Sequence, residues 1–242
     1  MAELDGTEFV SNAANNAGGA IYASTGATIT LNKTTFTSNE AKEGGAIRML
    51  STATLNDTDS IFEGNIATTE EGGAINSNGS ITLVGTKFIE NKAESQGKRG
   101  GAIYLTVGTL NATNVVFEGN VSSGNGGAIV LTSAAETVFD GCIFKNNTSG
   151  NRAGAIYLHN SGVMTTLRCE FNGNSAAGLG GAIYGTSSGF YVDGDSEVEG
   201  SGSKFIGNTA SGAGALYIDK EAVLNGTVFE NNKAISSAKF TT

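Results

Sequence analysis

The stretch FNGNSAAGLGGAIY, residues 171–184, contains the two short motifs that decide the fold of this 242-residue chain. It begins with a Phe-x-x-Asn motif, Phe171 to Asn174, and ends with a Gly-Gly-Ala-Ile motif, Gly180 to Ile183, before Tyr184. The small and polar residues between the two motifs favour turns. Both motifs return many times along the sequence, and the period of such a repeat determines the architecture.

The Phe-x-x-Asn motif occurs nine times and uses nine of the 12 Phe residues. Successive motif Phe residues are 27, 26, 26, 29, 27, 27, 34 and 24 positions apart. This regular order defines a repeat of about 27 residues, with motif pairs Phe9 and Asn12, Phe36 and Asn39, Phe62 and Asn65, Phe88 and Asn91, Phe117 and Asn120, Phe144 and Asn147, Phe171 and Asn174, Phe205 and Asn208, and Phe229 and Asn232.

The Gly-Gly-Ala-Ile motif alternates with the first motif and begins 8 to 12 residues after a motif Phe. Two of its eight copies are variants in which Ala153 and Ala213 replace the first Gly. We expect the paired Gly residues to let the chain turn closely against the coils above and below. The six full copies begin at Gly18, Gly44, Gly72, Gly100, Gly126 and Gly180.

The residue types decide between a helical repeat and a β-solenoid. The segments around each motif Phe are rich in Thr, Val, Ile and Phe with alternating polarity, as in Thr227-Val228-Phe229. No segment shows a sustained period of 3.6 residues with helix caps. We therefore predict an all-β, parallel β-solenoid of about nine coils over residues 1–242, with equivalent residues of neighbouring coils roughly 4.8 Å apart.

Strand alternation predicts which side chains enter the core. The motif Phe is expected to point inward together with the small residue two positions before it, such as Thr34 or Cys142. The motif Asn is expected at the end of the strand, because its side chain bonds backbone groups in tight bends and tolerates positive φ. Stacked Asn side chains are expected to bond one another in a ladder.

Composition excludes several classes of protein. The chain has 36 Gly and no Pro, but 39% hydrophobic residues argue against disorder. A net charge of −9 argues against a nucleic-acid partner. No run of 18 apolar residues is present, so we expect no membrane-spanning helix. Two Cys and one His are too few for a zinc site of the usual type, and we expect no cofactor.

The interleaved motifs resemble the passenger repeats of the polymorphic outer membrane proteins of chlamydiae, from Phe9 to Asn232. The resemblance implies a right-handed parallel β-helix on a bacterial cell surface. It also implies an extracellular autotransporter passenger that acts as an adhesin without catalysis, with a host-cell surface protein or glycan as its receptor.

The chain differs from the whole pattern of that family. It shows no apolar signal segment at Met1, no middle domain and no translocator barrel, and Leu4 to Phe9 resembles Leu224 to Phe229. We therefore expect a fragment of a longer passenger, anchored in the outer membrane through another part. Uncapped solenoid edges also raise end-to-end self-association as an alternative.

Two Cys residues lie one coil apart. Cys142 and Cys169 are separated by 27 positions, and each stands two residues before a motif Phe. Neighbours roughly 4.8 Å apart lie within the Cα range of a disulfide. The alternatives are therefore a staple formed in an oxidising compartment and two small buried residues that replace Thr.

The longest repeat predicts a protruding loop. The distance from motif Gly to the next motif Phe is 16 to 18 positions except for 25 between Gly180 and Phe205, which places the insertion in residues 185–203. Loops often carry function, so Phe190 and Tyr191 are binding candidates. Acidic residues at alternate positions form a weak calcium candidate against a solvated acidic loop, namely Asp193, Asp195 and Glu197.

A Tyr stripe is the third candidate for a binding site. Tyr157, Tyr184 and Tyr217 occupy the same outward position of consecutive coils. Stacked Tyr side chains present a rigid amphipathic surface that is favoured in interfaces. The alternative is packing between coils that shields the sheet.

A polysaccharide-active enzyme is the other functional alternative, because such chemistry uses paired carboxylates. On a β-helix the pair would arise one period apart. Asp57 and Asp140 meet Val84 and Leu167 at that distance, which disfavours an enzyme.

Overall fold

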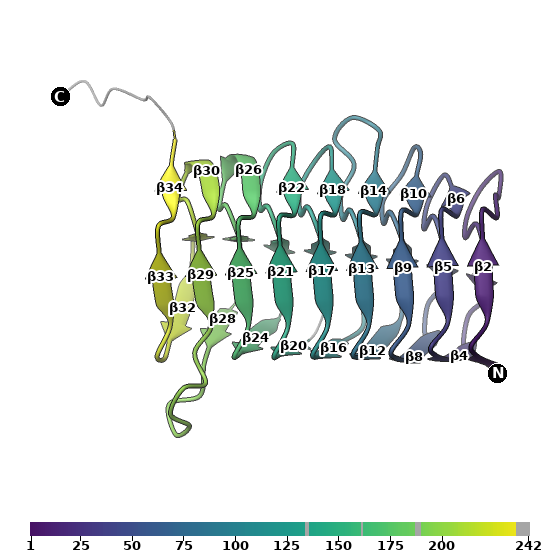
Figure 1. The fold of residues 1–242 in the computed structure, drawn as a ribbon, viewed down its shortest axis with the longest axis horizontal. Coiled ribbons are helices and arrows are strands. Elements are labelled where there is room, and N and C mark those ends of the chain that lie inside the picture. Colours follow the sequence, from purple (N-terminus) through teal and green to yellow (C-terminus); the bar gives the residue numbers. More distant parts are fainter. Residues whose placement is uncertain (134–135, 161, 187–189, 236–242) are drawn as a thin grey trace.

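The computed structural model describes residues 1–133, 136–160, 162–186 and 190–235, with the side chain of Phe190 outside this part. Within these residues the chain forms 34 strands and no helix. Each complete coil contributes four strands, one to each of four parallel sheets that run along a single axis (Figure 1). The prediction of an all-β parallel solenoid is therefore confirmed.

Sheet I and sheet II contain nine strands each, and the nine strands of sheet II delimit eight full turns. The strands of sheet I are β1 (Ala2–Asp5), β4 (Thr28–Asn32), β8 (Thr54–Thr58), β12 (Ser80–Val84), β16 (Leu110–Thr113), β20 (Glu136–Asp140), β24 (Val163–Leu167), β28 (Phe190–Asp193) and β32 (Glu221–Leu224). Those of sheet II are β2 (Glu8–Val10), β5 (Thr35–Thr37), β9 (Ile61–Glu63), β13 (Lys87–Ile89), β17 (Val116–Glu118), β21 (Ile143–Lys145), β25 (Glu170–Asn172), β29 (Lys204–Ile206) and β33 (Val228–Glu230).

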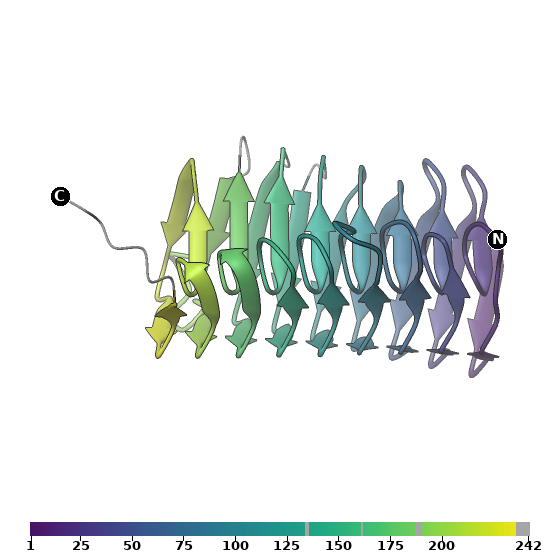
Figure 2. The same ribbon diagram turned by 90° about the horizontal axis from the view of Figure 1, so that it is seen from above.

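Sheet III and sheet IV contain eight strands each. The strands of sheet III are β6 (Glu40–Ala41), β10 (Ile66–Ala67), β14 (Lys92–Ala93), β18 (Val121–Ser122), β22 (Thr148–Ser149), β26 (Ser175–Leu179), β30 (Thr209–Gly212) and β34 (Lys233–Ala234). Those of sheet IV, which is formed by the Ile of the Gly-Gly-Ala-Ile motifs and the residues after it, are β3 (Ile21–Ala23), β7 (Ile47–Met49), β11 (Ile75–Ser77), β15 (Ile103–Leu105), β19 (Ile129–Leu131), β23 (Ile156–His159), β27 (Ile183–Thr186) and β31 (Leu216–Ile218). Figure 2 shows the same stack of coils from above.

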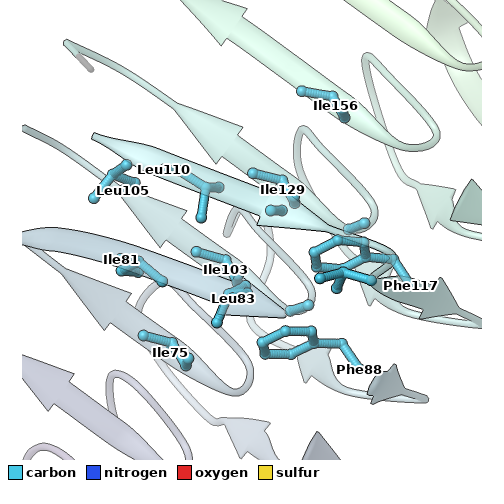
Figure 3. Packing of buried hydrophobic residues seen from close by; sticks show 14 of the residues in the cluster. Ile75, Ile81, Leu83, Phe88, Ile103, Leu105, Leu110, Phe117, Ile129 and Ile156 are labelled. Atoms are coloured by element: carbon cyan, nitrogen blue, oxygen red, sulfur yellow. The ribbon is translucent and has the colours of Figure 1, made fainter. Parts of the chain in front are cut away.

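Rows of identical residues fill the core. Every motif Phe pairs in register with the next motif Phe, and their ring centroids lie 4.6 to 5.0 Å apart. The seven interior rings from Phe36 to Phe205 are fully buried. Figure 3 shows Phe88 below Phe117 and the parallel row of Ile75, Ile103, Ile129 and Ile156. The predicted inward direction of both motifs is therefore confirmed.

The motif Asn side chains form a continuous ladder from Asn12 to Asn232, as the sequence predicts. The Nδ2 atom of each Asn donates to Oδ1 of the next, at 2.8 to 3.0 Å. At Asn120, Nδ2 also donates to the Phe88 carbonyl (2.9 Å), and Oδ1 accepts the backbone N–H of Asn91 (3.0 Å). The ladder thus satisfies buried amides in a corner of the coil where the backbone alone cannot do so.

The positive φ expected at the motif Asn belongs instead to the residue before it. In all nine coils this residue has φ between 53° and 65°, as at Ser38 (53°), Glu90 (53°) and Gly119 (65°). None of the nine motif Asn residues has a positive φ, and the backbone N–H of the motif Asn donates along the ladder, as at Asn91. The left-handed residue before it makes the bend, which corrects the sequence-based assignment.

Candidate functional site

The Tyr stripe exists, but most of it is covered. The rings of Tyr157 and Tyr184 stack at 5.4 Å, and those of Tyr184 and Tyr217 at 4.7 Å. Tyr157 and Tyr184 are each only 5% exposed, and they pack with Val130 and Ala153 in a small cluster separate from the main core. The stripe therefore faces away from the core, but the expectation of an open Tyr surface is wrong for these two rings.

A cation covers part of the same stripe. The guanidinium carbon of Arg152 lies 4.9 Å from the ring centroid of Tyr184, a distance typical of a cation–π contact. Leu179 and Tyr217 are partly buried against the same cluster. This packing between coils stabilises the turn before sheet IV, and only Tyr217 leaves partly exposed area for a ligand.

The insertion is shorter than the predicted loop of residues 185–203. Its first part continues the solenoid, because β27 pairs with β31 and β28 pairs with both β24 and β32. The chain leaves the rod only after Asp193 and returns at β29 (Figure 1). The protruding segment is therefore about residues 194–203.

The aromatic residues assigned to this loop belong to β28. Tyr191 is fully buried, and its hydroxyl lies 2.8 Å from Thr166 Oγ1. Burial raises the pKa of Tyr191 well above its usual value. Tyr191 is thus a core residue, which overturns its assignment to a binding loop, while the side chain of Phe190 lies outside the described part of the structure.

The calcium candidate residues do not converge. Asp193 is fully buried, and its carboxylate accepts hydrogen bonds from Thr166 Oγ1 (2.6 Å), Thr227 Oγ1 and the backbone N–H of Ser203 (2.9 Å). Asp195 instead accepts the backbone N–H of Glu197 in a local turn. Across the described ranges no group of three metal-ligating side chains forms, so the residues of the weak calcium candidate, Asp193, Asp195 and Glu197, are not brought together. Asp193 holds the base of the loop onto its neighbouring coils.

The two Cys residues are free, buried thiols. Cys142 Sγ donates to the Ala112 carbonyl and Cys169 Sγ to the Phe139 carbonyl, both at 3.4 Å. Burial raises the pKa of Cys169 well above its usual value. Thr34 Oγ1 makes the equivalent bond to the Leu4 carbonyl, so the thiols occupy the position of the Thr hydroxyls in other coils.

One buried acid, Asp57, was weighed from the sequence only as a member of a catalytic pair, and the structure places it opposite Leu83 instead of Val84. Asp57 lies in register between Leu31 and Leu83 on the inward face of sheet I and is 3% exposed. Thr86 Oγ1 donates to its Oδ2 atom, but Oδ1 has no hydrogen-bond partner in the described residues. Removal from water, the largest effect, raises the pKa of Asp57 above its usual value.

We expect Asp57→Leu to stabilise the protein at pH 7 by about 1–3 kcal/mol, because it removes an incompletely paired buried acid. Thr86 could then bond the carbonyl of residue 57, as Thr34 bonds that of Leu4. Because the pKa is raised in the folded state, wild type is most stable below the unfolded pKa and loses this stability as pH rises through the folded pKa. Urea unfolding at pH 3 and pH 7 should show a smaller gain at pH 3, and Asp59→Asn at an exposed position is the control. An equal gain at both pH values would contradict the assignment.

A neutral face is the surface that sequence reasoning missed. The outward side chains of β4, β8, β12 and β16 are all uncharged, and ten of the eleven are Thr, Ser or Asn. All eleven are exposed or partly exposed. The signal was the alternation of these residues with buried, mostly apolar residues in each strand. We call this surface the neutral face: Thr28, Thr30, Asn32, Thr54, Asn56, Thr58, Ser80, Thr82, Val84, Asn111 and Thr113.

A hollow of about 250 Å³ adjoins the neutral face. The side chains of Thr54 and Ser80 line it from the face, and the turns that precede β8, β12 and β16 complete it. The lining contains no charged residue: Ser51, Thr52, Ala53, Thr54, Asn78, Gly79, Ser80, Val107 and Gly108.

Comparison with known proteins agrees with this architecture. Residues 51–195 match the family described as the right-handed β-helix region. The chain is also 37% identical over 127 residues to the probable autotransporter YfaL of Escherichia coli (strain K12). That match covers 46% of this chain and only 10% of the relative, so the chain spans about a tenth of that protein's length.

No solved structure matches the chain. Among the described residues there is also no helix with the length and hydropathy needed to cross a membrane. The family match includes the interior coils with their stacked Phe and Asn residues and gives the solenoid the handedness expected from the motif resemblance. Since it covers more than half of the sequence, the chain belongs to the right-handed β-helix family.

Proposed function

We propose that the chain is a segment of a bacterial surface adhesin, a non-catalytic autotransporter passenger that attaches to host cells. One observation carries the proposal: every repeated motif residue serves the interior of the rod or its turns. Phe, Asn, Gly and Ile of the motifs hold the coils together, as at Phe117 and Asn120. The repeat therefore encodes a scaffold, and its outer faces are free to carry a binding surface.

Two similarities support this proposal. The relative with 37% identity is described as a probable autotransporter. The motif pair resembles that of the chlamydial-type polymorphic outer membrane proteins, whose passengers are exposed at the cell surface. An extracellular location, anchored through a part of the protein outside this sequence, follows from the proposal.

The arrangement of carboxylates also favours a scaffold over a polysaccharide-active enzyme. Asp57 and Asp193 both point into the core, on β8 and β28, with four strands of sheet I between them. On the surface, Asp140 is paired with Arg168, whose Nη2 atom lies 2.5 Å from Oδ1. Carboxylate pairs for glycoside hydrolysis face a common substrate roughly 5–10 Å apart, and none of these three acids is placed in this way.

We expect the purified, fluorescently labelled chain to bind cultured host epithelial cells saturably and to be displaced by excess unlabelled chain. Flow cytometry measures this binding, with the same chain unfolded in urea and rapidly diluted as the control for non-specific adhesion. Binding that does not saturate, or that the unfolded control reproduces, would contradict the adhesin proposal.

End-to-end self-association stays a prediction. Light scattering of the purified chain tests it, since a single species at 24.5 kDa contradicts assembly and a concentration-dependent series of multiples supports it.

A further inference from the structure

We propose that the neutral face and its adjoining hollow bind an uncharged glycan. The inference rests on the proposed function, because it assigns the receptor chemistry and the surface that recognises it. It draws on three features of the described residues: the hydrogen-bonding groups of the face, the distribution of charge around it, and the hollow at its edge.

The first feature is a set of side chains that both donate and accept hydrogen bonds. Thr30, Asn56, Thr82 and Asn111 occupy one outward row on consecutive strands, and their side chains have no hydrogen-bond partner in the described part of the chain. Hydroxyl and amide groups match the hydroxyls of a sugar, which also act as both donor and acceptor. Within the face, only Thr54 and Thr28 bond each other, with 3.2 Å between their Oγ1 atoms.

The second feature is the absence of charge from the outward side chains of four consecutive strands in a chain of net charge −9. Acidic side chains border the face on both sides, with Glu3 and Asp5 on β1 and with Glu136 on β20, where Asp140 is paired with Arg168. Acidic glycans would be repelled by these borders, whereas an uncharged glycan loses no ionic solvation when it binds. The charge pattern therefore selects a neutral ligand.

The third feature is the hollow, which has a mixed lining suited to a sugar ring. Thr52, Thr54 and Ser80 supply hydroxyl groups, and Ala53 and Val107 supply apolar contacts. Thr54 Oγ1 already donates to Thr28 Oγ1, and Ser80 Oγ accepts the backbone N–H of Thr109, so each of these two hydroxyls offers its remaining hydrogen-bonding capacity. Val107 is 44% exposed at the rim and can contact the C–H groups of a ring. We infer that one sugar sits in the hollow while its neighbours lie on the adjoining face.

The repeat strengthens this inference for a polymer. Each coil presents nearly the same row of groups roughly 4.8 Å further along the axis. A long glycan can engage several coils at once, so weak contacts add through effective concentration. A polysaccharide should therefore bind more tightly than its own monosaccharide.

The test inserts charge without changing shape. Asn56→Asp/Asn111→Asp places two carboxylates in the exposed row, and Asn15→Asp, at an exposed position away from this face, is the matched control. Binding of each folded variant is measured on immobilised mannan, dextran and galactan, with hyaluronate as the acidic probe, at low and high salt. We expect at least one neutral probe to bind with little salt dependence, and the double variant to weaken it by about tenfold or more. Asn15→Asp should bind as wild type does.

Several results would overturn the inference: no binding to any neutral probe, tighter binding to hyaluronate, or equal binding by the double variant and wild type. Wild type could instead form a dimer of about 49 kDa, twice the chain mass, that the two substitutions abolish. That result would show that the face pairs with a second copy of the chain. The same variants on host cells separate the two proposals. If the double variant binds host cells as wild type does, the glycan proposal fails and the adhesin proposal stands. If wild type binds a neutral glycan but no host cell, the adhesin proposal fails and the glycan proposal stands.

Discussion

Gly101→Ala should prevent the solenoid from folding, or destabilise it by more than about 4 kcal/mol. A Cβ atom at this position would lie 2.1 Å from the carbonyl oxygen of Gly127 and 2.7 Å from the backbone nitrogen of Val121. Both are main-chain atoms of the next coil, held in the inter-coil ladders. Relief of the overlap would require the coils to separate, which opens the core on both sides.

The first Gly of the same motif provides the matched comparison. Gly100 has φ 69°, and Ala153 occupies the equivalent position with φ 61°, so the coil tolerates a methyl group there. An added Cβ at Gly100 would lie 2.4 Å from the carbonyl oxygen of Ile103, which belongs to the same turn and not to the next coil. Because Ala153 shows that the turn can relieve this overlap locally, we expect Gly100→Ala to destabilise the protein by only about 1–2 kcal/mol. This contrast explains why the second Gly is present in all eight motifs while the first is replaced twice.

Soluble yield, circular dichroism and the midpoint of urea unfolding measure the difference between the two variants. Gly97→Ala in a neighbouring open turn is a further control, because no atom lies within 4 Å of its added Cβ. If Gly101→Ala and Gly100→Ala unfold at the same urea concentration, close approach of the coils is not what fixes the second Gly.

Asn120→Ala should destabilise the protein by roughly 3–6 kcal/mol, because several buried polar groups lose their partners at about 1–3 kcal/mol each. The substitution removes the acceptor of the backbone N–H and side-chain amide of Asn91. It also removes the donors to the Phe88 carbonyl and to Asn147 Oδ1. Water cannot replace these bonds, since both neighbouring Asn side chains are fully buried.

The first step of the ladder supplies the control for this substitution. Asn12 is exposed, and its side chain donates only to Asn39 Oδ1 at 2.8 Å. We expect Asn12→Ala to cost about 1 kcal/mol or less, although it removes the same residue type from the same motif. Urea midpoints and protease resistance compare the two variants, and equal losses would show that the ladder stabilises the rod independently of burial.

The repeated part of the structure follows from the sequence because one arrangement satisfies all copies together. Phe36 and Phe205 must both be buried, and only stacking in register buries every interior motif Phe while it aligns every motif Asn. The backbone conformation before the motif Asn was harder to predict from the sequence, because residues such as Ser38 and Gly119 share neither size nor polarity. Their common φ is imposed by the turn and not by the residue type.

The candidate sites were harder to predict where the repeat is irregular. Residues 190–193 belong to the longest repeat, so they were assigned to the loop, yet Tyr191 and Asp193 alternate inward as a strand requires. The spacing of the motifs shows that residues are inserted in this repeat. It does not show whether they leave the rod before or after β28. The burial of Tyr157 and Tyr184 likewise depends on the turn that contains Arg152. The motif does not determine the path of this turn.

The direction of the hydrogen bonds between coils has a mechanical consequence for the proposed role in attachment. These bonds run along the rod axis, so tension between the two ends pulls on the coils in series. Each coil advances the rod by roughly 4.8 Å, whereas its roughly 27 residues extend to about 90 Å once peeled away. Successive coils would release chain length in steps, so a rod under tension would lengthen gradually while the coils that have not yet been peeled away stay folded.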